Sequence, residues 1–259
     1  MVYILDLIKV SNIRLTYQSL KGETEAIKGV DFSVPKGEFV SIIGPSGCGK
    51  STLLNIISGL LKPSGGEVIY NDKDVKNRLD KMGYMFQKDY LFEWLTVWDN
   101  VLLGLKIKKI LTKESIDRVD KLLENYDLAK FKDHKPNELS GGMRQRVALI
   151  RTLALNPEVL LLDEPFSALD YQTRLKVCDE VTDIIKREEK TAIMVTHDLG
   201  EAIATSDRII MLTKRPSKVK IDVKVEFANK EATPFQRRKE PEFNEYFNLL
   251  WKELDKYNE

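Results

Sequence analysis

The sequence predicts an α/β fold that is built on a mostly parallel sheet. Short apolar runs at residues 38–43, 159–162 and 192–195 alternate with longer segments that have helical periodicity. Parallel strands need long crossover connections, usually helices, and strands covered on both faces are apolar throughout. A glycine-rich turn also joins the first of these runs to an apolar helix expected at residues 51–60. Strand, turn and helix in this order are typical of βαβ units.

The remaining patterns divide the chain into three parts. Apolar and polar residues alternate within residues 11–34, which predicts an antiparallel β region beside the sheet. Residues 116–126 and 141–156 have helical periodicity and few strand signals. The last part of the chain is charged and ends in an amphipathic stretch at 243–254. We therefore expect a core of residues 1–87 and 157–214, a helical subdomain of residues 88–156 and an extension of residues 215–259.

The composition argues against some classes of function. The 41 basic and 40 acidic residues give a net charge of +1, so no nucleic-acid partner is expected, because such surfaces carry a basic excess. No run approaches the ~18 apolar residues that cross a bilayer, and the first ten residues lack the features of a secretory leader. Cys48 and Cys178 lack a metal-type spacing, and we interpret them as free thiols in the reducing cytoplasm.

The strongest motif occupies residues 44–52 and matches the pattern G-x-x-x-x-G-K-[ST]. Its glycines let backbone N–H groups point at phosphates, and the following helix contributes its N-terminal dipole. Lys50 would supply positive charge to the β- and γ-phosphates, and the Ser51 hydroxyl would bind Mg²⁺. The predicted nucleotide contacts in this loop are Gly44, Pro45, Ser46, Gly47, Cys48, Gly49, Lys50, Ser51 and Thr52.

A second motif, at residues 159–164, is an apolar strand that ends in Asp163 and Glu164. At the C-terminal edge of a parallel sheet, Asp163 would reach the Mg²⁺ shell. Glu164 would face the γ-phosphate and polarise the attacking water as a general base. Cys48, within the loop, is either a small residue that is tolerated there or a redox-sensitive thiol beside a helix N-terminus.

Between these motifs, residues 139–146 read Leu-Ser-Gly-Gly-Met-Arg-Gln-Arg and resemble the signature motif of the ATP-binding cassette (ABC) ATPases. Further landmarks of that family follow in order. Gln87 resembles the Q-loop glutamine, residues 167–170 resemble the D-loop, and His197 resembles the switch histidine. Tyr17 lies where the family places an aromatic ring against adenine, with a core position as the alternative.

This resemblance covers residues 10–213 and implies a P-loop NTPase fold with a RecA-like mixed sheet core, an N-terminal antiparallel β region and an α-helical subdomain. It also implies that ATP and Mg²⁺ are the cofactors, and that two ATPase subunits clamp two ATP molecules head to tail. Met143 stands where the family usually has glutamine, which leaves the other signature contacts in place. The implied residues are Glu164, His197 and Gln87 for catalysis, Ser51, Gln87 and Asp163 for the metal, and Ser140, Gly141, Gly142 and Asp170 for nucleotide contacts.

The segment after the Q-loop glutamine predicts a partner. It is rich in aromatic residues, of which we expect Tyr90, Phe92 and Trp94 at an interface. Residues 91–97 resemble the nitrate, sulfonate and taurine importer branch, although Glu93 replaces a common proline, and the Lys-Arg-Pro run at 214–216 also resembles that branch.

Membership of that branch implies an integral membrane permease as partner and, indirectly, a substrate-binding protein. It also implies a peripheral location on the cytoplasmic face of the cell membrane. The alternatives are a non-transport soluble ABC ATPase and an exporter subunit. For the extension, the amphipathic stretch is either a helix that packs on the main domain or a regulatory or dimer contact.

Overall fold

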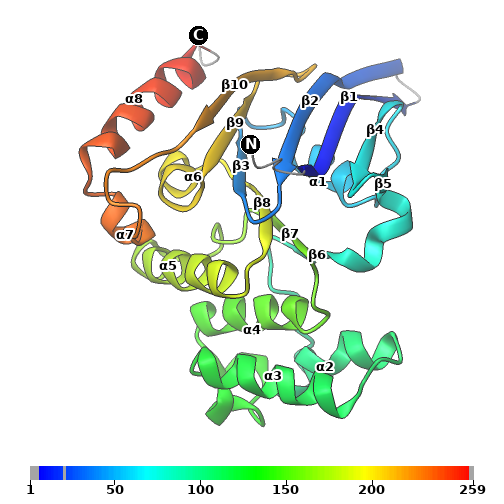
Figure 1. Cartoon of the computed structure of the whole chain (residues 1–259), viewed down its shortest axis with the longest axis vertical. Helices are drawn as coiled ribbons and strands as arrows, with labels where there is room; N and C mark the ends of the chain where they lie inside the picture. Colours follow the sequence, from blue (N-terminus) through cyan, green and yellow to red (C-terminus); the bar gives the residue numbers. More distant parts are fainter. Residues whose placement is uncertain (1–5, 20–21, 257–259) are drawn as a thin grey trace, which may run out of the picture.

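The computed structural model of the chain describes residues 6–19 and 22–256. Two sheets and their covering helices form one end of the molecule in Figure 1, and a group of helices from the middle of the sequence forms a separate lobe. Residues 1–5, where the absence of a leader was expected, lie outside the described residues, as does the predicted end of the extension at 257–259.

The first sheet is antiparallel and has the strand order β2-β1-β4-β5. Alternate residues of β2, namely Val30, Phe32 and Val34, are buried, so one face of this sheet covers a core. The alternation within residues 11–34 is therefore confirmed as strand periodicity. The strands are β1 (Asp6–Ser19), β2 (Gly22–Pro35), β4 (Gly65–Tyr70) and β5 (Lys73–Asp74).

The second sheet is mixed. In spatial order it consists of β10 (Val219–Lys224), β9 (Arg208–Leu212), β3 (Phe39–Ile43), β8 (Thr191–Val195), β7 (Val159–Asp163) and β6 (Met82–Met85). The strands from β9 to β6 run parallel, and β10 is antiparallel to β9. The predicted fold class, a mixed sheet core beside an antiparallel β region, is confirmed.

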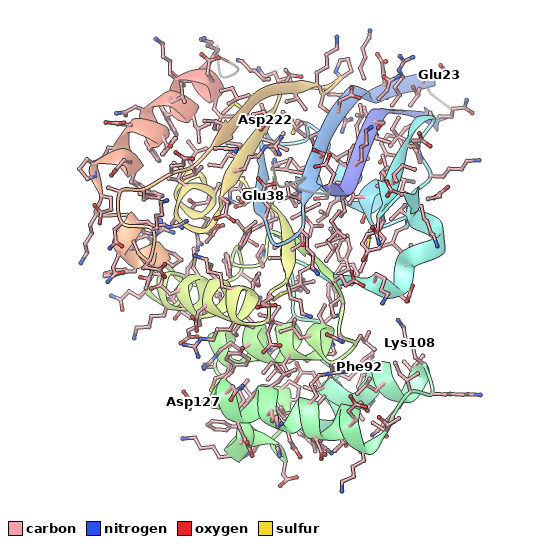
Figure 2. The ribbon with its side chains drawn as sticks, viewed as in Figure 1. Glu23, Glu38, Phe92, Lys108, Asp127 and Asp222 are labelled. Carbon is pink, nitrogen blue, oxygen red and sulfur yellow. The ribbon has the colours of Figure 1, made fainter. Side chains whose placement is uncertain are left out.

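The β9–β10 hairpin was not predicted. The Thr213 N–H donates to the Lys218 carbonyl (2.9 Å) and closes the turn, so the sheet continues beyond residue 214, where we expected the extension to begin. On the outer strand, Asp222 forms an ion pair with Arg208, which also lies 3.6 Å from Glu38 (both carboxylates are labelled in Figure 2). Backbone hydrogen bonds and the ion pairs of Arg208 therefore both attach the hairpin to the sheet.

The middle of the chain is helical, as predicted. A helix that was not predicted individually, residues 97–107, begins where the Thr96 side chain accepts a hydrogen bond from the Asp99 N–H. Short 3₁₀ turns occur at Val75–Lys81, Ala129–Phe131 and Pro136–Glu138. The α-helices are α1 (Lys50–Ile57), α2 (Val97–Ile107), α3 (Lys113–Asn125), α4 (Gly141–Leu153), α5 (Tyr171–Arg187), α6 (Leu199–Thr205), α7 (Pro234–Arg237) and α8 (Pro241–Asp255).

Three apolar clusters hold these layers together. One joins α2–α5 to one face of the mixed sheet, and a second contains α1 between the two sheets. The third lies under α8, where Leu250 is fully buried and Phe243, Phe247 and Leu254 pack against α6 and β9. The amphipathic stretch of the extension is thus a helix that packs on the main domain.

Candidate functional site

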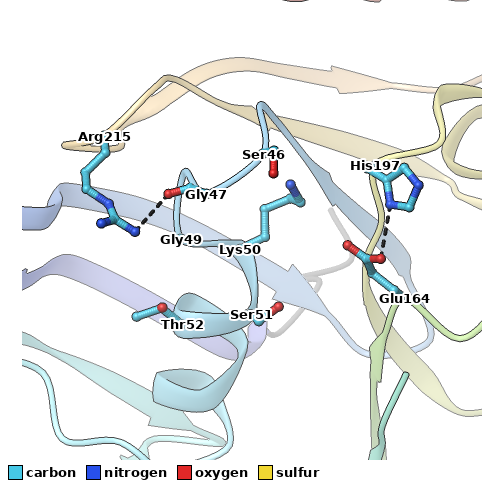
Figure 3. Close-up of a pocket in the computed structure, with 9 residues that line it drawn as sticks. All are labelled: Ser46, Gly47, Gly49, Lys50, Ser51, Thr52, Glu164, His197 and Arg215. Carbon is cyan, nitrogen blue, oxygen red and sulfur yellow. Dashed lines mark hydrogen bonds and ion pairs between the residues drawn. The ribbon is translucent and has the colours of Figure 1, made fainter. Parts of the chain in front are cut away.

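A cavity of about 510 Å³ opens where β3 ends and α1 begins. Six residues of the predicted phosphate loop line it, together with Glu164 at the end of β7 and His197 after β8 (Figure 3). Arg215, from the β9–β10 turn, completes the wall. Parallel strands end at the same edge of the sheet, which explains how residues so distant in sequence meet here. The lining residues are Ser46, Gly47, Gly49, Lys50, Ser51, Thr52, Glu164, His197 and Arg215.

The loop backbone depends on two glycines. A Cβ on Gly44 would lie 2.9 Å from the Leu212 carbonyl oxygen and 3.0 Å from Cys48 Sγ, so β9 leaves no room for a side chain. Gly49 precedes α1 with φ +109°, a conformation that L side chains rarely adopt. No side chain caps α1, and its first N–H groups are therefore available to an anion.

Lys50 is buried beside the cavity, and its Nζ donates to the carbonyl oxygens of Gly44 (2.9 Å) and Pro45 (3.2 Å). Within the described part of the chain, no carboxylate lies within ion-pair distance of this ammonium group. A buried cation that is solvated only by carbonyl groups favours a nearby anion, because burial without a counter-charge is costly. Gly44 and Pro45 thus act by orienting the lysine, and neither lines the cavity.

Ser51 and Asp163 form the pair of oxygen ligands expected for Mg²⁺. The Ser51 hydroxyl donates to Asp163 Oδ1 (2.9 Å), and the Tyr84 hydroxyl lies 3.1 Å from Oδ2 of the same carboxylate. Burial raises the pKa of Asp163, and the hydrogen bonds from Ser51 and Tyr84 oppose that shift. Hydroxyl and carboxylate oxygens fit Mg²⁺, which usually takes one or two protein ligands together with phosphate oxygens and water.

Glu164 is held by its neighbours at the other side of the cavity. Its backbone is left-handed, with φ +46°, an unusual conformation for a residue with a side chain. Its Oε2 lies 3.1 Å from His197 Nδ1 and 3.5 Å from Gln87 Nε2, and Gln87 also donates to Ser167 Oγ (3.1 Å). The three residues predicted for catalysis therefore meet, and Gln87 lies beside Glu164 rather than in the wall of the cavity.

Tyr17 lies at the edge of the loop. Tyr17 is 41% exposed, so the core alternative does not hold for this residue. Its hydroxyl lies 3.1 Å from Thr52 Oγ1, the last residue of the predicted loop. The exposed ring is available for stacking against a planar ligand.

The residues predicted to contact the nucleotide of a second copy, Ser140, Gly141, Gly142 and Asp170, do not line this cavity. Ser140 accepts a hydrogen bond from the Met143 N–H (3.3 Å) and caps α4, and Asp170 caps α5 in the same way. Gly142 is buried, and a Cβ there would lie 2.8 Å from a Val177 methyl carbon. Close packing of α4 on α5 is thus one physical reason for this glycine, which sequence reasoning had assigned only to anion contact. Gly141 remains a prediction.

Cys48 does not face the cavity. It is almost fully buried in the cluster between the sheets, and burial raises the pKa of its thiol. Cys178 is buried and free as well, with a thiol pKa raised to about 12 by the same cause. Neutral, buried thiols are unreactive, which favours the packing interpretation of Cys48 over the redox switch.

Sequence reasoning missed two side chains that complete the site. Neither Tyr84 nor Arg215 was predicted as a site residue, although Tyr84 contacts Asp163 and Arg215 lines the cavity. The signal available for Arg215 was the Lys-Arg-Pro run at 214–216, which we related only to an importer branch.

Comparison with known proteins identifies the family. The family model described as ABC transporter matches residues 27–167. The chain belongs to the ABC transporter family. It is an ATPase of that family and the ATP-binding subunit of a transporter. The family resemblance inferred from the signature motif is thereby confirmed.

Several relatives show how far the similarity extends. An uncharacterised ABC transporter ATP-binding protein from Bacillus subtilis is 47% identical over 246 residues, which are 95% of each chain. A taurine import ATP-binding protein from Roseobacter denitrificans is 38% identical over 94% of each chain. A nitrate import ATP-binding protein from Synechocystis sp. is 37% identical over 92% of this chain and 91% of its own.

A solved ABC cassette has the same fold. A dimeric post-hydrolysis cassette bound to ADP and phosphate superposes with a TM-score of 0.72 at 37% identity, covering 85% of this chain and 99% of its own. Among the residues that the structure describes, no helix is long and apolar enough to cross a membrane.

Proposed function

We propose that this ABC ATPase powers an importer, and that two copies bind and hydrolyse ATP head to tail beneath a separate integral permease. The cargo would be a small solute of the nitrate, sulfonate and taurine or vitamin-precursor class, delivered by a substrate-binding protein. The chain would lie on the cytoplasmic face of the membrane as a peripheral subunit. Support comes from the taurine and nitrate import relatives and from an exposed aromatic loop, residues 90–94, that follows Gln87 in the sequence.

That loop is the observation that carries the coupling proposal. Trp94 is 72% exposed and Tyr90 is 60% exposed, and the ring of Phe92 lies 5.0 Å from that of Trp94. Figure 2 shows Phe92 beside α2. Large aromatic side chains that gather on a surface are typical of binding interfaces.

The aromatic loop is held rigidly, although its rings are exposed. Asn100 is fully buried in α2, accepts from the Phe92 N–H (2.8 Å) and donates to the carbonyls of Phe92 (3.1 Å), Leu95 (3.3 Å) and Thr96 (2.9 Å). These bonds satisfy the loop backbone, so the rings are presented with little loss of conformational entropy on binding.

The same segment is fastened to the signature helix α4. Arg144 forms a bidentate ion pair with Asp89 (2.9 and 3.3 Å), and Arg151 donates to the carbonyls of Asp89 and Tyr90 (2.7 Å each). Gln87, at the start of the segment, contacts Glu164. A movement at the partner surface would therefore be transmitted to both the proposed catalytic carboxylate and the signature helix.

We propose the following chemistry for the site. Lys50 and the N–H groups at the start of α1 bind the phosphates, Tyr17 stacks on adenine, and Ser51 and Asp163 hold Mg²⁺, which neutralises phosphate charge. Glu164 accepts a proton from the attacking water, and His197 orients Glu164.

The parts of the chain take matching roles in this proposal. Ser140, Gly141, Gly142 and Asp170 serve the nucleotide of the second copy. Residues 88–156 act as the signature subdomain that moves against the nucleotide core, and the segment after β10 supports that core.

Affinity purification of the tagged chain from its native membranes, followed by mass spectrometry, tests this proposal. A co-purified integral permease, with or without a substrate-binding protein, is the expected result. Ribosomal or DNA-repair proteins without a permease would overturn the transport role, and a permease that exports would overturn the importer assignment. The ligand of a co-purified binding protein would identify the cargo.

A further inference from the structure

Arg215 is a charged side chain that lines the cavity and has no role in the proposed chemistry. It extends from the β9–β10 turn, and its Nη2 donates to the carbonyl oxygen of Gly47 in the phosphate loop (2.9 Å). Its side chain is exposed, and no carboxylate within the described residues forms an ion pair with it. A guanidinium group has five N–H donors, so four remain available after the bond to Gly47.

The turn that carries Arg215 is fixed by hydrogen bonds to β2, beside the phosphate loop. The Ser217 N–H donates to the Ala26 carbonyl (3.0 Å), and the Lys28 N–H donates to the Ser217 carbonyl (2.9 Å). Ser217 Oγ would also lie 3.7 Å from a Cβ on Gly49. The position of Arg215 over the loop is therefore imposed by the fold and does not depend on the arginine alone.

The two ends of the cavity differ in the residues that line them, and Arg215 lies at the end opposite Glu164 (Figure 3). Figure 3 shows Glu164 and His197 on one side of Lys50, with Arg215 and Thr52 on the other. Thr52 contacts Tyr17, the proposed adenine-stacking residue (3.1 Å). Arg215 thus lies toward the nucleoside end of the proposed site, remote from the proposed catalytic carboxylate.

We propose that Arg215 is a nucleotide-binding residue whose guanidinium contacts the phosphate nearest the nucleoside, the α-phosphate. This inference rests on the proposed nucleotide site. Arginine presents planar, paired donors that suit phosphate oxygens. Arg215 has no carboxylate partner among the described residues, and it lies beside a loop whose backbone favours anions. ATP and ADP share the α-phosphate, so Arg215 strengthens the binding of both nucleotides to the same degree.

Equilibrium titration of the purified chain with fluorescent ATP and ADP analogues tests this contact. Arg215→Gln removes the charge but keeps an amide N–H donor for the Gly47 carbonyl. We expect it to weaken both nucleotides equally, by about tenfold, as for the loss of one charge-assisted hydrogen bond. The loss should shrink as salt is raised, because salt screens an exposed charge. Arg215→Lys should restore part of the affinity.

Lys218→Ala is the matched control, because it removes a positive charge from the same turn without touching the cavity. It should leave both affinities unchanged. A weakening confined to ATP in Arg215→Gln would overturn the α-phosphate assignment in favour of the γ-phosphate end, and a loss that disappears with 2′-deoxynucleotides would assign the contact to the ribose instead.

Unchanged ATP and ADP affinities in Arg215→Gln would overturn the proposal and leave Arg215 as a support for the loop. Lys50→Ala separates that outcome from failure of the whole site. If Lys50→Ala loses nucleotide while Arg215→Gln does not, the proposed ATP site stands without Arg215. If neither variant loses nucleotide, the site itself is wrong.

Discussion

Replacing Tyr84 with phenylalanine should destabilise the protein through Asp163. The hydroxyl lies 3.1 Å from Asp163 Oδ2 and 3.0 Å from Asn55 Oδ1, so the substitution leaves a carboxylate oxygen and an amide oxygen without this partner. A hydrogen bond to a charged group contributes about 1.5–3 kcal/mol, and partial exposure of this pair reduces the expected loss to about 1–2 kcal/mol. For a chain of this size, the loss corresponds to a fall in Tm of about 2–8 °C.

The pH dependence of this loss identifies its cause. Burial raises the pKa of Asp163, and the Tyr84 hydrogen bond opposes that rise, so Tyr84→Phe should raise the pKa of Asp163 further. A carboxyl group whose pKa is raised by folding binds protons more tightly in the folded state, so stability falls as the pH rises through its folded pKa. The difference in the free energy of unfolding between wild type and Tyr84→Phe should therefore be largest above the folded-state pKa of Asp163, and it should become smaller in acid.

Thermal unfolding followed by circular dichroism across a pH series measures both effects. Tyr171→Phe, on the exposed side of α5, is the matched control and should not change Tm. A Tyr84→Phe variant as stable as Tyr171→Phe would refute the reasoning, and so would a loss of equal size at every pH.

Three further outcomes follow from the packing and chemistry of the site. Gly142→Ala should lower the free energy of unfolding by about 1–3 kcal/mol in a urea titration, because its Cβ would lie 2.8 Å from Val177. Adding Val177→Ala should recover part of that loss. No change in stability would argue against close packing there. Glu164→Gln should retain ATP in a binding titration but release phosphate about 10²–10⁴-fold more slowly, and wild-type turnover would exclude Glu164 as the base. Cys48 and Cys178 should resist alkylation in the folded protein and react once it is denatured, whereas rapid labelling of the native chain would contradict their burial.

The parts of the site that could be predicted lie within short stretches of sequence. The loop at residues 44–52 and the acids after β7 each combine a structural signal with a chemical one, because a buried strand ends where its functional residues begin. Their meeting at one edge of the sheet then follows from the parallel arrangement of β3, β7 and β8.

What the sequence could not reveal depends on contacts between distant elements. Tyr84 reaches Asp163 from the neighbouring strand, and Arg215 reaches Gly47 from a turn far along the chain. Each contact joins elements far apart in the sequence, so no local periodicity or spacing predicts it. The β9–β10 hairpin was missed because we interpreted the charged, proline-containing segment after residue 214 as an extension, although Val219–Lys224 alternates apolar and charged residues as a half-exposed strand does.

The aromatic loop was recognised by composition, but its order depends on one buried side chain. Asn100 forms four hydrogen bonds to the backbone of the loop, and an asparagine in a helix gives no such indication from sequence alone. The exposure of Trp94 on an ordered loop therefore emerges only from the structure.

The most direct test of coupling to a permease is to compare two exposed tryptophans. Trp94 lies on the aromatic loop and is 72% exposed, whereas Trp251 lies on α8 and is 53% exposed. In pull-downs from native membranes, we predict that Trp94→Ala loses the integral permease but keeps the ATPase activity of the isolated subunit, and that Trp251→Ala retains the permease. Full retention of the permease by Trp94→Ala, or its loss only in Trp251→Ala, would contradict the proposed coupling surface.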